Sequence, residues 1–469
     1  MSSVGSTGGT SIGIDGIVSG LDTTSIINAL MTAEAAPQTQ LKSQLSSLQS
    51  TISALQALNT SVKSIADTAS ALAKPGGLNL YSTSSTSTAL TASADSTAAA
   101  GSISMQVTQL AAGQVSVTAA QSAWATNPPV LTIVGSDGTQ HEVTATTDSI
   151  ADVVGAINGA KAGVTAVQVA AGTASDGTKL YRIQLTSDTG AGHAFSVYDG
   201  SAASVTAGTA TNLLTQPGAA TISQAQDAKA VLWGGTGAEQ TITSTTNTFT
   251  DLMPGVDITA TAVTSGPATV SVARSNDQVA AKFGSLLSSL SNVFATIASK
   301  SAVTTTTASD STTAASGGIF TGDSTVRNAN DSLFQALAYP VGSVTPSQLG
   351  ITINQDGTFD FDAGKLSAAL ADDPDGVTKA MQTVAGRIAD AANTASDPFT
   401  GTITSSITGD QSTAKQMTDS ISDWDLRLTA RRSTLETTYA ALETQLSAMK
   451  SQSSWLASQI SGLSTGSSK

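Results

Sequence analysis

Apolar residues that recur every seven positions dominate the C-terminal end of the sequence. A spacing of seven places side chains on one narrow stripe of an α-helix, as in the seam of a coiled coil. One isolated helix cannot bury such a stripe. The sequence therefore predicts a long C-terminal helix that packs against another helix, either within its own domain or in a second molecule. The stripe consists of Ile421, Leu428, Leu435, Leu442, Met449, Leu456 and Leu463.

The row of residues that would complete this seam is irregular. A permanent coiled coil would have Leu or Ile throughout the row, but polar residues occupy half of it. The sequence therefore predicts a narrow, incomplete seam whose contacts are individually weak. The row consists of Asp425, Arg432, Tyr439, Leu446, Ser453 and Ile460.

The N-terminal end is also expected to be helical. Asp22 fits the N-cap of a short helix that has Ile27 and Leu30 on one side. Pro37 is expected to end or kink that helix. A second heptad row follows and predicts a longer helix, which stops at the Lys-Pro-Gly-Gly sequence of residues 74–77. The members of this row are Leu41, Leu48, Leu55, Val62 and Ala69.

The region from 80 to 272 has short alternating apolar stretches that predict β-strands. The Asp-Gly pairs at 137–138 and 176–177 are typical of tight hairpin turns. A helical pattern interrupts the strands at Ile150–Ala160. We expect two β domains here, one inserted into the other.

Helical character returns after Asn276, where an apolar face begins at Phe283. The Ser/Thr-rich run at 304–318 is expected to be a loop, and 331–338 a helix. A hairpin is expected over 351–361, and Asp373 is expected to cap a helix that starts at Pro374.

The predicted fold class is α+β and multidomain: terminal helices form a coiled-coil-like leg and a helical domain, with two antiparallel β domains inserted between them. The expected division is a flexible terminal leg segment at 1–40, the N-terminal helix of the helical domain at 41–79, an outer β domain at 80–113 and 221–273, an inserted β domain at 114–220, a helical domain with a β-hairpin at 274–427, and a C-terminal coiled-coil leg at 428–469.

The charge balance limits the classes of partner. The chain of 469 residues has a net charge of −14 and only 20 Lys and Arg, so nucleic acid and anionic membranes are poor partners. There is no Cys, and no apolar run is long enough to span a membrane. The N-terminal residues lack the basic and apolar regions of a standard cleaved signal. They are compatible with an export route that reads an uncharged, unfolded N-terminus.

A search for catalytic or metal-binding patterns predicts neither. His141 and His193 are the two histidines, and each lies in a region expected to form strands, far from other metal ligands in sequence. Two G-x-S-x-G matches, at 9–13 and 462–466, lack the strand and helix that a nucleophile elbow requires. We expect no enzyme activity, cofactor or metal.

The order of short motifs along nearly the whole chain resembles the flagellar filament cap proteins, a family also called hook-associated protein 2. The inserted β domain is the exception. The motifs are Gly16 to Asp22 with Leu30, Met31, Glu34 and Pro37; Gly101 to Ala111; Ala225 to Ala228; Asp251 to Val256; Gly318 to Thr325; Leu349 to Ile351; and Asp356 to Leu370.

The resemblance implies a secreted, non-catalytic homo-oligomer at the distal tip of the bacterial flagellar filament. Such proteins leave the cell by flagellar type III export. The β domains would form a plate and the terminal helices its legs, which would promote folding and insertion of flagellin and prevent its loss. The implied partners are the chain itself, flagellin, hook–filament junction proteins and an export chaperone at the C-terminal helix.

The resemblance also implies where the legs make contact with flagellin or with other copies. The expected contact residues of the C-terminal leg are Leu428, Leu435, Tyr439, Leu442, Leu446, Met449, Leu456 and Ile460, and those of the N-terminal leg are Ser19, Gly20, Leu21, Asp22, Leu30, Met31, Glu34 and Pro37.

Two other functions remain open at this point. The β domains of a tip protein are exposed, so the chain could be an adhesin for host glycans, with Trp124 and Trp233 as candidate contacts. Packing in the core is the simpler role for both tryptophans. The chain could also be another axial protein of the flagellum, although the motifs favour the cap. The sequence does not give the number of subunits.

Overall fold

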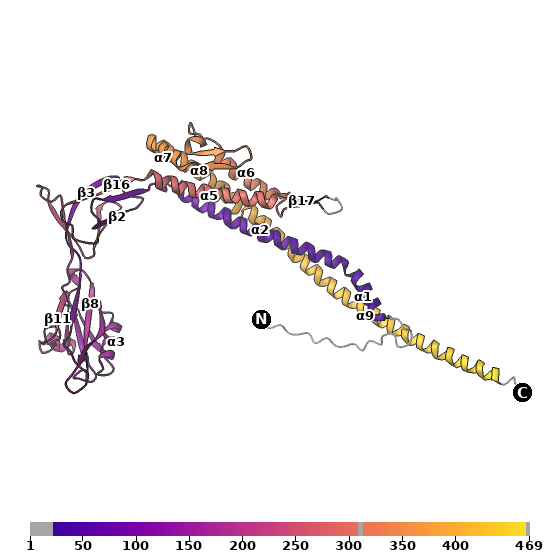
Figure 1. Ribbon diagram of the computed structural model, residues 1–469, viewed down its shortest axis with the longest axis horizontal. Helices are drawn as coiled ribbons and strands as arrows, with labels where there is room; N and C mark the ends of the chain where they lie inside the picture. Colours follow the sequence, from indigo (N-terminus) through magenta and orange to yellow (C-terminus); the bar gives the residue numbers. More distant parts are fainter. Residues whose placement is uncertain (1–21, 308–312, 466–469) are drawn as a thin grey trace.

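The structure is a computed structural model that describes residues 22–307 and 313–465. A long helical stem carries two β parts at one end, and the last helix extends to the opposite end (Figure 1). This arrangement confirms the predicted α+β class, with helices at both termini and antiparallel sheets between them.

The stem is built on two long antiparallel segments and several shorter helices. Its elements are α1 (Thr23–Glu34), α2 (Ala36–Ala73), α5 (Asn276–Ser301), β17 (Val303–Thr307), β18 (Thr313–Gly317), α6 (Ser324–Ala338), η2 (Pro346–Leu349), β19 (Ile351–Ile353), β20 (Phe359–Phe361), α7 (Ala363–Asp372), α8 (Pro374–Ser396) and α9 (Thr402–Thr465).

Helix α2 is the spine of the stem, and α8 and α9 cover it one after the other. Near the C-terminal end of α2, Gln382 of α8 donates a hydrogen bond to the Lys74 carbonyl at 3.2 Å. Further along, Asn59 of α2 donates to Thr404 of α9 at 3.3 Å. Both helices therefore run antiparallel to α2, and a short turn between them, which displays Phe399, breaks what would otherwise be one partner helix.

One apolar cluster holds the stem together. Successive turns of α2 bury Leu55, Val62 and Ile65, and α5 adds Phe283, which is fully buried. Complete burial of one such side chain stabilises the fold by about 1.5–3 kcal/mol. The heptad pattern predicted for α2 is therefore an internal seam of the stem.

The outer β part pairs strands that are far apart in sequence. A five-stranded sheet has the order β1-β16-β3-β12-β13, and a three-stranded sheet has the order β14-β15-β2. Both sheets contribute to one core around Met105 and Ile258. The elements are β1 (Tyr81–Ser85), β2 (Leu90–Ala94), β3 (Gly101–Gln109), β12 (Ala228–Leu232), β13 (Gln240–Ser244), β14 (Thr248–Met253), β15 (Val256–Ala260) and β16 (Ala268–Arg274).

The inserted β part lies farthest from the stem (Figure 1). Two four-stranded sheets, β10-β9-β5-β6 and β11-β4-β8-β7, share a core with one face of α3. Its elements are β4 (Gly113–Val117), β5 (Val130–Gly135), β6 (Gln140–Thr144), α3 (Ile150–Ala160), β7 (Val164–Thr173), β8 (Lys179–Thr189), η1 (Ala191–His193), β9 (Phe195–Asp199), α4 (Ala202–Thr206), β10 (Thr211–Asn212) and β11 (Ala220–Ser223).

Several local predictions are confirmed by the structure. The helix predicted at Ile150–Ala160 has those bounds. Asp373 caps α8, because its side chain accepts a hydrogen bond from the Gly376 amide. The hairpin expected over 351–361 is β19 and β20.

One prediction in the helical region is wrong, and another is too short. The run expected to be a loop at 304–318 contributes residues to two antiparallel strands, β17 and β18, because Thr favours extended backbone. Residues 331–338 are helical as predicted, but α6 begins seven residues earlier, at Ser324, because Asp323 accepts hydrogen bonds from the Thr325 and Val326 amides.

Three expected boundaries also differ from the observed helices. Residues 23–34 are helical, as the pattern after Asp22 predicted, and residues 36–40 belong to α2, so the flexible segment expected at 1–40 does not extend to residue 40. Helix α2 starts at Ala36, because Pro37 lies in its first turn, where the missing amide hydrogen costs little. The boundary expected between 427 and 428 falls inside the continuous helix α9.

Two phenylalanines allow a test of the stem core. Phe283→Ala should lower the free energy of unfolding of the stem by about 3–5 kcal/mol, because it removes a buried ring and leaves a cavity. The matched control is Phe399→Ala, whose side chain is 91% exposed and should change stability by less than about 0.5 kcal/mol. Urea unfolding followed by the helical circular dichroism signal measures both. Equal effects would contradict the assigned core.

Candidate functional site

At the free end of the stem, two stretches of helix run antiparallel to each other. One consists of α1 and the start of α2, and the other of residues 421–461 of α9. We call this part the terminal leg. Gln38 is buried between the helices and donates hydrogen bonds to the Ile421 carbonyl, at 3.2 Å, and to the Asp425 carboxylate. This buried amide fixes how the two segments align, because a shift of either helix would leave it without a partner.

Charged and polar pairs continue the alignment along α1, toward its start. Arg431 forms an ion pair with Glu34 at 2.9 Å, and Arg432 donates to the Asn28 side chain. Arg432 also lies 3.5 Å from Glu436 on its own helix. Arg432 therefore connects α9 to α1 at a seam position where the sequence pattern indicated only that an apolar residue was missing.

Helix α1 begins where the sequence pattern predicted. The Asp22 carboxylate accepts a hydrogen bond from the Ser25 amide at 2.8 Å and another from the Ser25 hydroxyl at 2.5 Å. The bond from the hydroxyl, followed by that from the amide, holds the pKa of Asp22 below its ordinary value. The cap therefore stays ionised at neutral pH.

The predicted C-terminal leg residues divide into two groups. Leu428, Leu435, Tyr439 and Leu446 are half-buried. Leu442 is 41% exposed, and the other three predicted residues are more than half exposed. The structure therefore partly buries one half of the predicted contact residues and leaves the other half on the surface.

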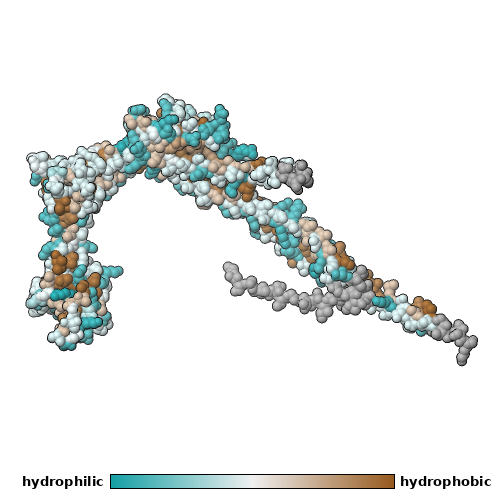
Figure 2. All heavy atoms as spheres, viewed as in Figure 1, coloured by the Kyte–Doolittle hydropathy of each residue, from teal (hydrophilic) through white to brown (hydrophobic). Residues whose placement is uncertain are grey.

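We call the exposed group the distal patch. Its members other than Leu442 are 55% to 65% exposed, a high value for large apolar side chains. Figure 2 shows hydrophobic side chains along this end of the stem. Trp455 belongs to the patch and was missed by the heptad analysis, because it lies one position off the stripe. The members are Leu442, Met449, Trp455, Leu456 and Ile460.

The predicted N-terminal leg residues occupy several settings. Leu30 is 41% exposed on α1, Met31 is half-buried, and Pro37 is exposed in the first turn of α2. Glu34 makes the ion pair with Arg431. Ser19, Gly20 and Leu21 lie outside the described residues.

Sequence reasoning also missed the partners that align the leg. Gln38, Asn28 and Arg431 carry no periodic signal. The opposite charges of Glu34 and Arg431 could have indicated an ion pair, but the two residues are 397 positions apart in the sequence. At such a separation, many other pairs of opposite charges are equally possible, so the sequence does not select this one.

The two tryptophans considered as glycan contacts differ. Trp124 is buried in the inserted β part and donates to Asp199 at 3.0 Å, so it packs in the core as expected. Trp233 is 43% exposed, so its predicted place in a core is wrong. The structure therefore offers no paired aromatic surface made of these two residues.

The histidines lie in the inserted β part. His141 is in β6, as expected, but His193 is in the short helix η1 and not in a strand. Across residues 22–307 and 313–465, no three His, Cys, Asp or Glu side chains are grouped so that they could hold a metal. Over the same residues, no helix is long and apolar enough to cross a membrane.

The fold and the site define a class: an elongated, multidomain protein in which a helical leg with exposed apolar side chains lies at the opposite end of the stem from antiparallel β parts (Figure 1). Sequence comparisons are more specific. The family model for the flagellar hook-associated protein 2 N-terminus matches residues 19–114, and that for its C-terminus matches residues 225–451. The two models together cover more than half of the chain. The chain belongs to the flagellar hook-associated protein 2 family, the family of the flagellar filament caps.

Individual relatives agree with this assignment. Flagellar hook-associated protein 2 of Escherichia coli strain K12 is 27% identical over 388 residues, which cover 77% of this chain and 78% of the relative. The lateral flagellar hook-associated protein 2 of Vibrio parahaemolyticus is 27% identical over 184 residues, or 38% of this chain and 39% of the relative. The crystal structure of the flagellar cap protein FliD D1-D2-D3 domains from Escherichia coli shares the fold, with a TM-score of 0.56 and 24% identity over 76% of this chain and 99% of that chain.

The buried amide of the leg gives a test of its alignment. Gln38→Ala should weaken the pairing of α1 and α2 with α9 by about 1–2 kcal/mol, because two hydrogen bonds are lost. Amide hydrogen exchange should then speed up in α1 and around residue 425 of α9. The control Glu34→Gln removes an exposed ion pair and should cost less than about 1 kcal/mol. Equal loss of protection in both variants would argue against the alignment.

Proposed function

We propose that this protein caps the distal tip of the bacterial flagellar filament as a secreted structural homo-oligomer without catalytic activity. The β parts would form the plate and the terminal legs would reach the filament. There the cap would promote the folding and insertion of exported flagellin and prevent its loss. Membership of the flagellar cap family supports this function. The observation that supports a contact between the leg and the filament is the exposed distal patch.

The distal patch suits a contact with the terminal helices of flagellin. Three of its residues, Leu442, Met449 and Leu456, are spaced by seven, so a partner helix could pack along them. The seam is narrow, because Ser453 interrupts the second row between Leu446 and Ile460. A contact of this kind is weak enough to break each time the cap moves to a new site.

The same patch would need a cover before export, because large exposed apolar groups favour aggregation. We propose that an export chaperone binds the C-terminal helix there. The hook–filament junction proteins would be further partners of the cap. An adhesive role is less favoured, because burial of Trp124 removes half of the proposed aromatic contact.

The test uses the source bacterium with this gene deleted and then restored. The patch variant carries Leu442→Gln, Met449→Gln and Leu456→Gln, which keep helix propensity while removing apolar surface. The matched control carries Gln445→Ala, Gln452→Ala and Gln459→Ala on another side of the same helix. The wild type and the control should restore long filaments. The patch variant should leave filaments short and release several-fold more monomeric flagellin into the medium.

Measurement of the cap protein itself in the medium separates an assembly defect from an export defect. A patch variant that is exported normally but fails to cap supports the leg contact. Normal filaments with the patch variant would contradict the role of the patch. Normal filaments in the deletion strain itself would contradict the capping function.

A further inference from the structure

Trp233 adopts an unusual backbone conformation at the surface of the outer β part. It lies between β12 and β13, at one edge of the five-stranded sheet, with φ of 50° and 43% of its surface exposed. A bulky L-residue rarely adopts a positive φ, and such strain concentrates at functional positions. The fold therefore places a large aromatic side chain at the surface at an energetic cost.

The turn around Trp233 is held by hydrogen bonds. The Trp233 carbonyl accepts from the Thr236 amide at 3.2 Å and from its hydroxyl at 2.7 Å. Glu239 accepts from the Gly235 amide at 2.8 Å, and the Trp233 amide donates to the Ser104 carbonyl at 3.3 Å. The turn is thus ordered before any partner arrives, which lowers the entropy cost of binding.

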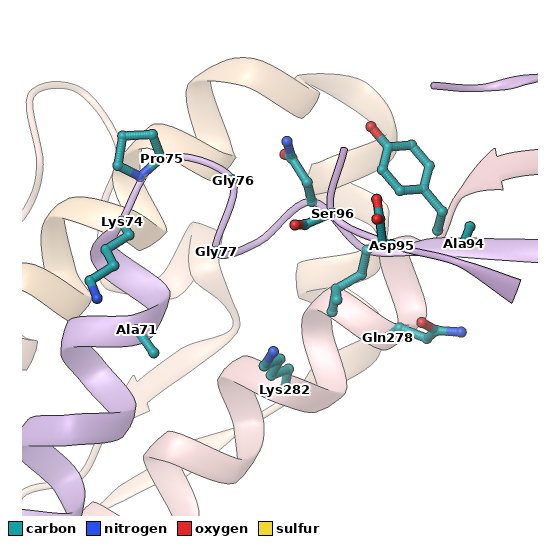
Figure 3. Close-up of a pocket in the computed structure, with 13 residues that line it drawn as sticks. Ala71, Lys74, Pro75, Gly76, Gly77, Ala94, Asp95, Ser96, Gln278 and Lys282 are labelled. Atoms are coloured by element: carbon teal, nitrogen blue, oxygen red, sulfur yellow. The ribbon is translucent and has the colours of Figure 1, made fainter. Parts of the chain in front are cut away.

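A pocket lies at the opposite edge of the same sheet, where the outer β part meets the stem. We call it the junction pocket. It has a volume of about 430 Å³ and opens between the end of α2, β1 and the start of α5. In Figure 3, Lys282 rises from α5 toward the loop of Asp95 and Ser96. Ala71 of α2 and Lys74, which follows this helix, also line the pocket.

The chemistry of the junction pocket matches an indole. The indole N–H is a donor only and needs an acceptor when buried. Asp95 can supply one: hydrogen bonds from the Thr97 hydroxyl and amide lower its pKa and keep it ionised. Across the described residues, neither Lys74 nor Lys282 forms an ion pair, so their ammonium groups are available to an aromatic face.

The sheet order places the two features at opposite edges of one sheet. In the order β1-β16-β3-β12-β13, the junction pocket adjoins β1 and Trp233 precedes β13. A projecting group on one side and a matching pocket on the other produce a head-to-tail contact, which closes into a ring when the rotation allows. We propose that Trp233 of one copy docks into the junction pocket of the next copy, an inference that rests on the proposed oligomeric cap.

Engineered cysteines test the contact in assembled caps, because the native chain has no Cys. Ala238→Cys lies in the Trp233 turn, and Ser96→Cys lies in the pocket; both side chains are exposed. A short bis-maleimide added to capped filaments from cells that express the double variant should give a ladder of multimers on a denaturing gel. Each single variant, and a control that pairs Ala238→Cys with Ser50→Cys on α2, should not give the ladder.

Purified full-length protein provides a second readout. Trp233→Ala and Lys282→Glu should each weaken self-association on the order of tenfold or more, because each removes one side of the contact. Tyr339→Ala, an exposed aromatic residue on the stem, is the control and should not change it. Analytical ultracentrifugation over a concentration series measures the association constants.

The outcomes distinguish this contact from the capping function itself. A multimer ladder that needs both cysteines supports the contact. Filaments of normal length that yield no ladder would overturn the docking of Trp233 and leave the capping function intact. Failure of the wild-type gene to restore filaments in the deletion strain would instead refute the capping function.

Discussion

The antiparallel packing of α2 against α8 and α9 is the interaction on which the rest of the structure depends. It joins two segments from opposite ends of the chain, and its apolar face supplies the centre of the stem core. The chain leaves the stem through β1, which follows α2, and returns through β16, which precedes α5. Helix α2 therefore connects the leg directly to the β parts, and its packing with α8 and α9 supports that connection.

Helix α9 is longer than any other helix of the described residues. It has 64 residues and is about 95 Å long. Its contact with α1, between Arg432 and Asn28, lies near the middle of α9. Farther along the same helix, the heptad stripe includes the exposed Leu442, Met449 and Leu456 of the distal patch. These side chains are part of the surface that we propose for contact with flagellin.

The β parts are organised so that one can vary without the other. Each has a core of its own, and the inserted part joins the outer part through β4 and β11 at its base. The two family models match residues 19–114 and 225–451 and leave out most of the inserted part. A separate core allows its surface to change without disturbing the stem or the outer sheets, whose opposite edges carry Trp233 and the junction pocket.

Local signals in the sequence determined much of the secondary structure. Asp22 and Asp373 cap the helices that they were predicted to cap, and the helix at Ile150–Ala160 has the predicted bounds. These features depend on contacts within one or two turns, so a pattern of neighbouring residues is sufficient to predict them. The Thr-rich hairpin of β17 and β18 was missed because composition indicated a loop, while β propensity favoured strands.

Tertiary structure alone decided which of these patterns meet. Gln38 donates a hydrogen bond to Asp425, and Glu34 forms an ion pair with Arg431, although each pair is separated by almost the whole length of the chain. Trp124 is buried whereas Trp233 is exposed, although both lie in similar β sequence. The heptad row of α9 is half-buried at Leu435 and exposed at Leu456, although both positions have the same apolar residue. Periodicity specifies a face of a helix, but the presence of a partner along that face depends on how distant segments pack.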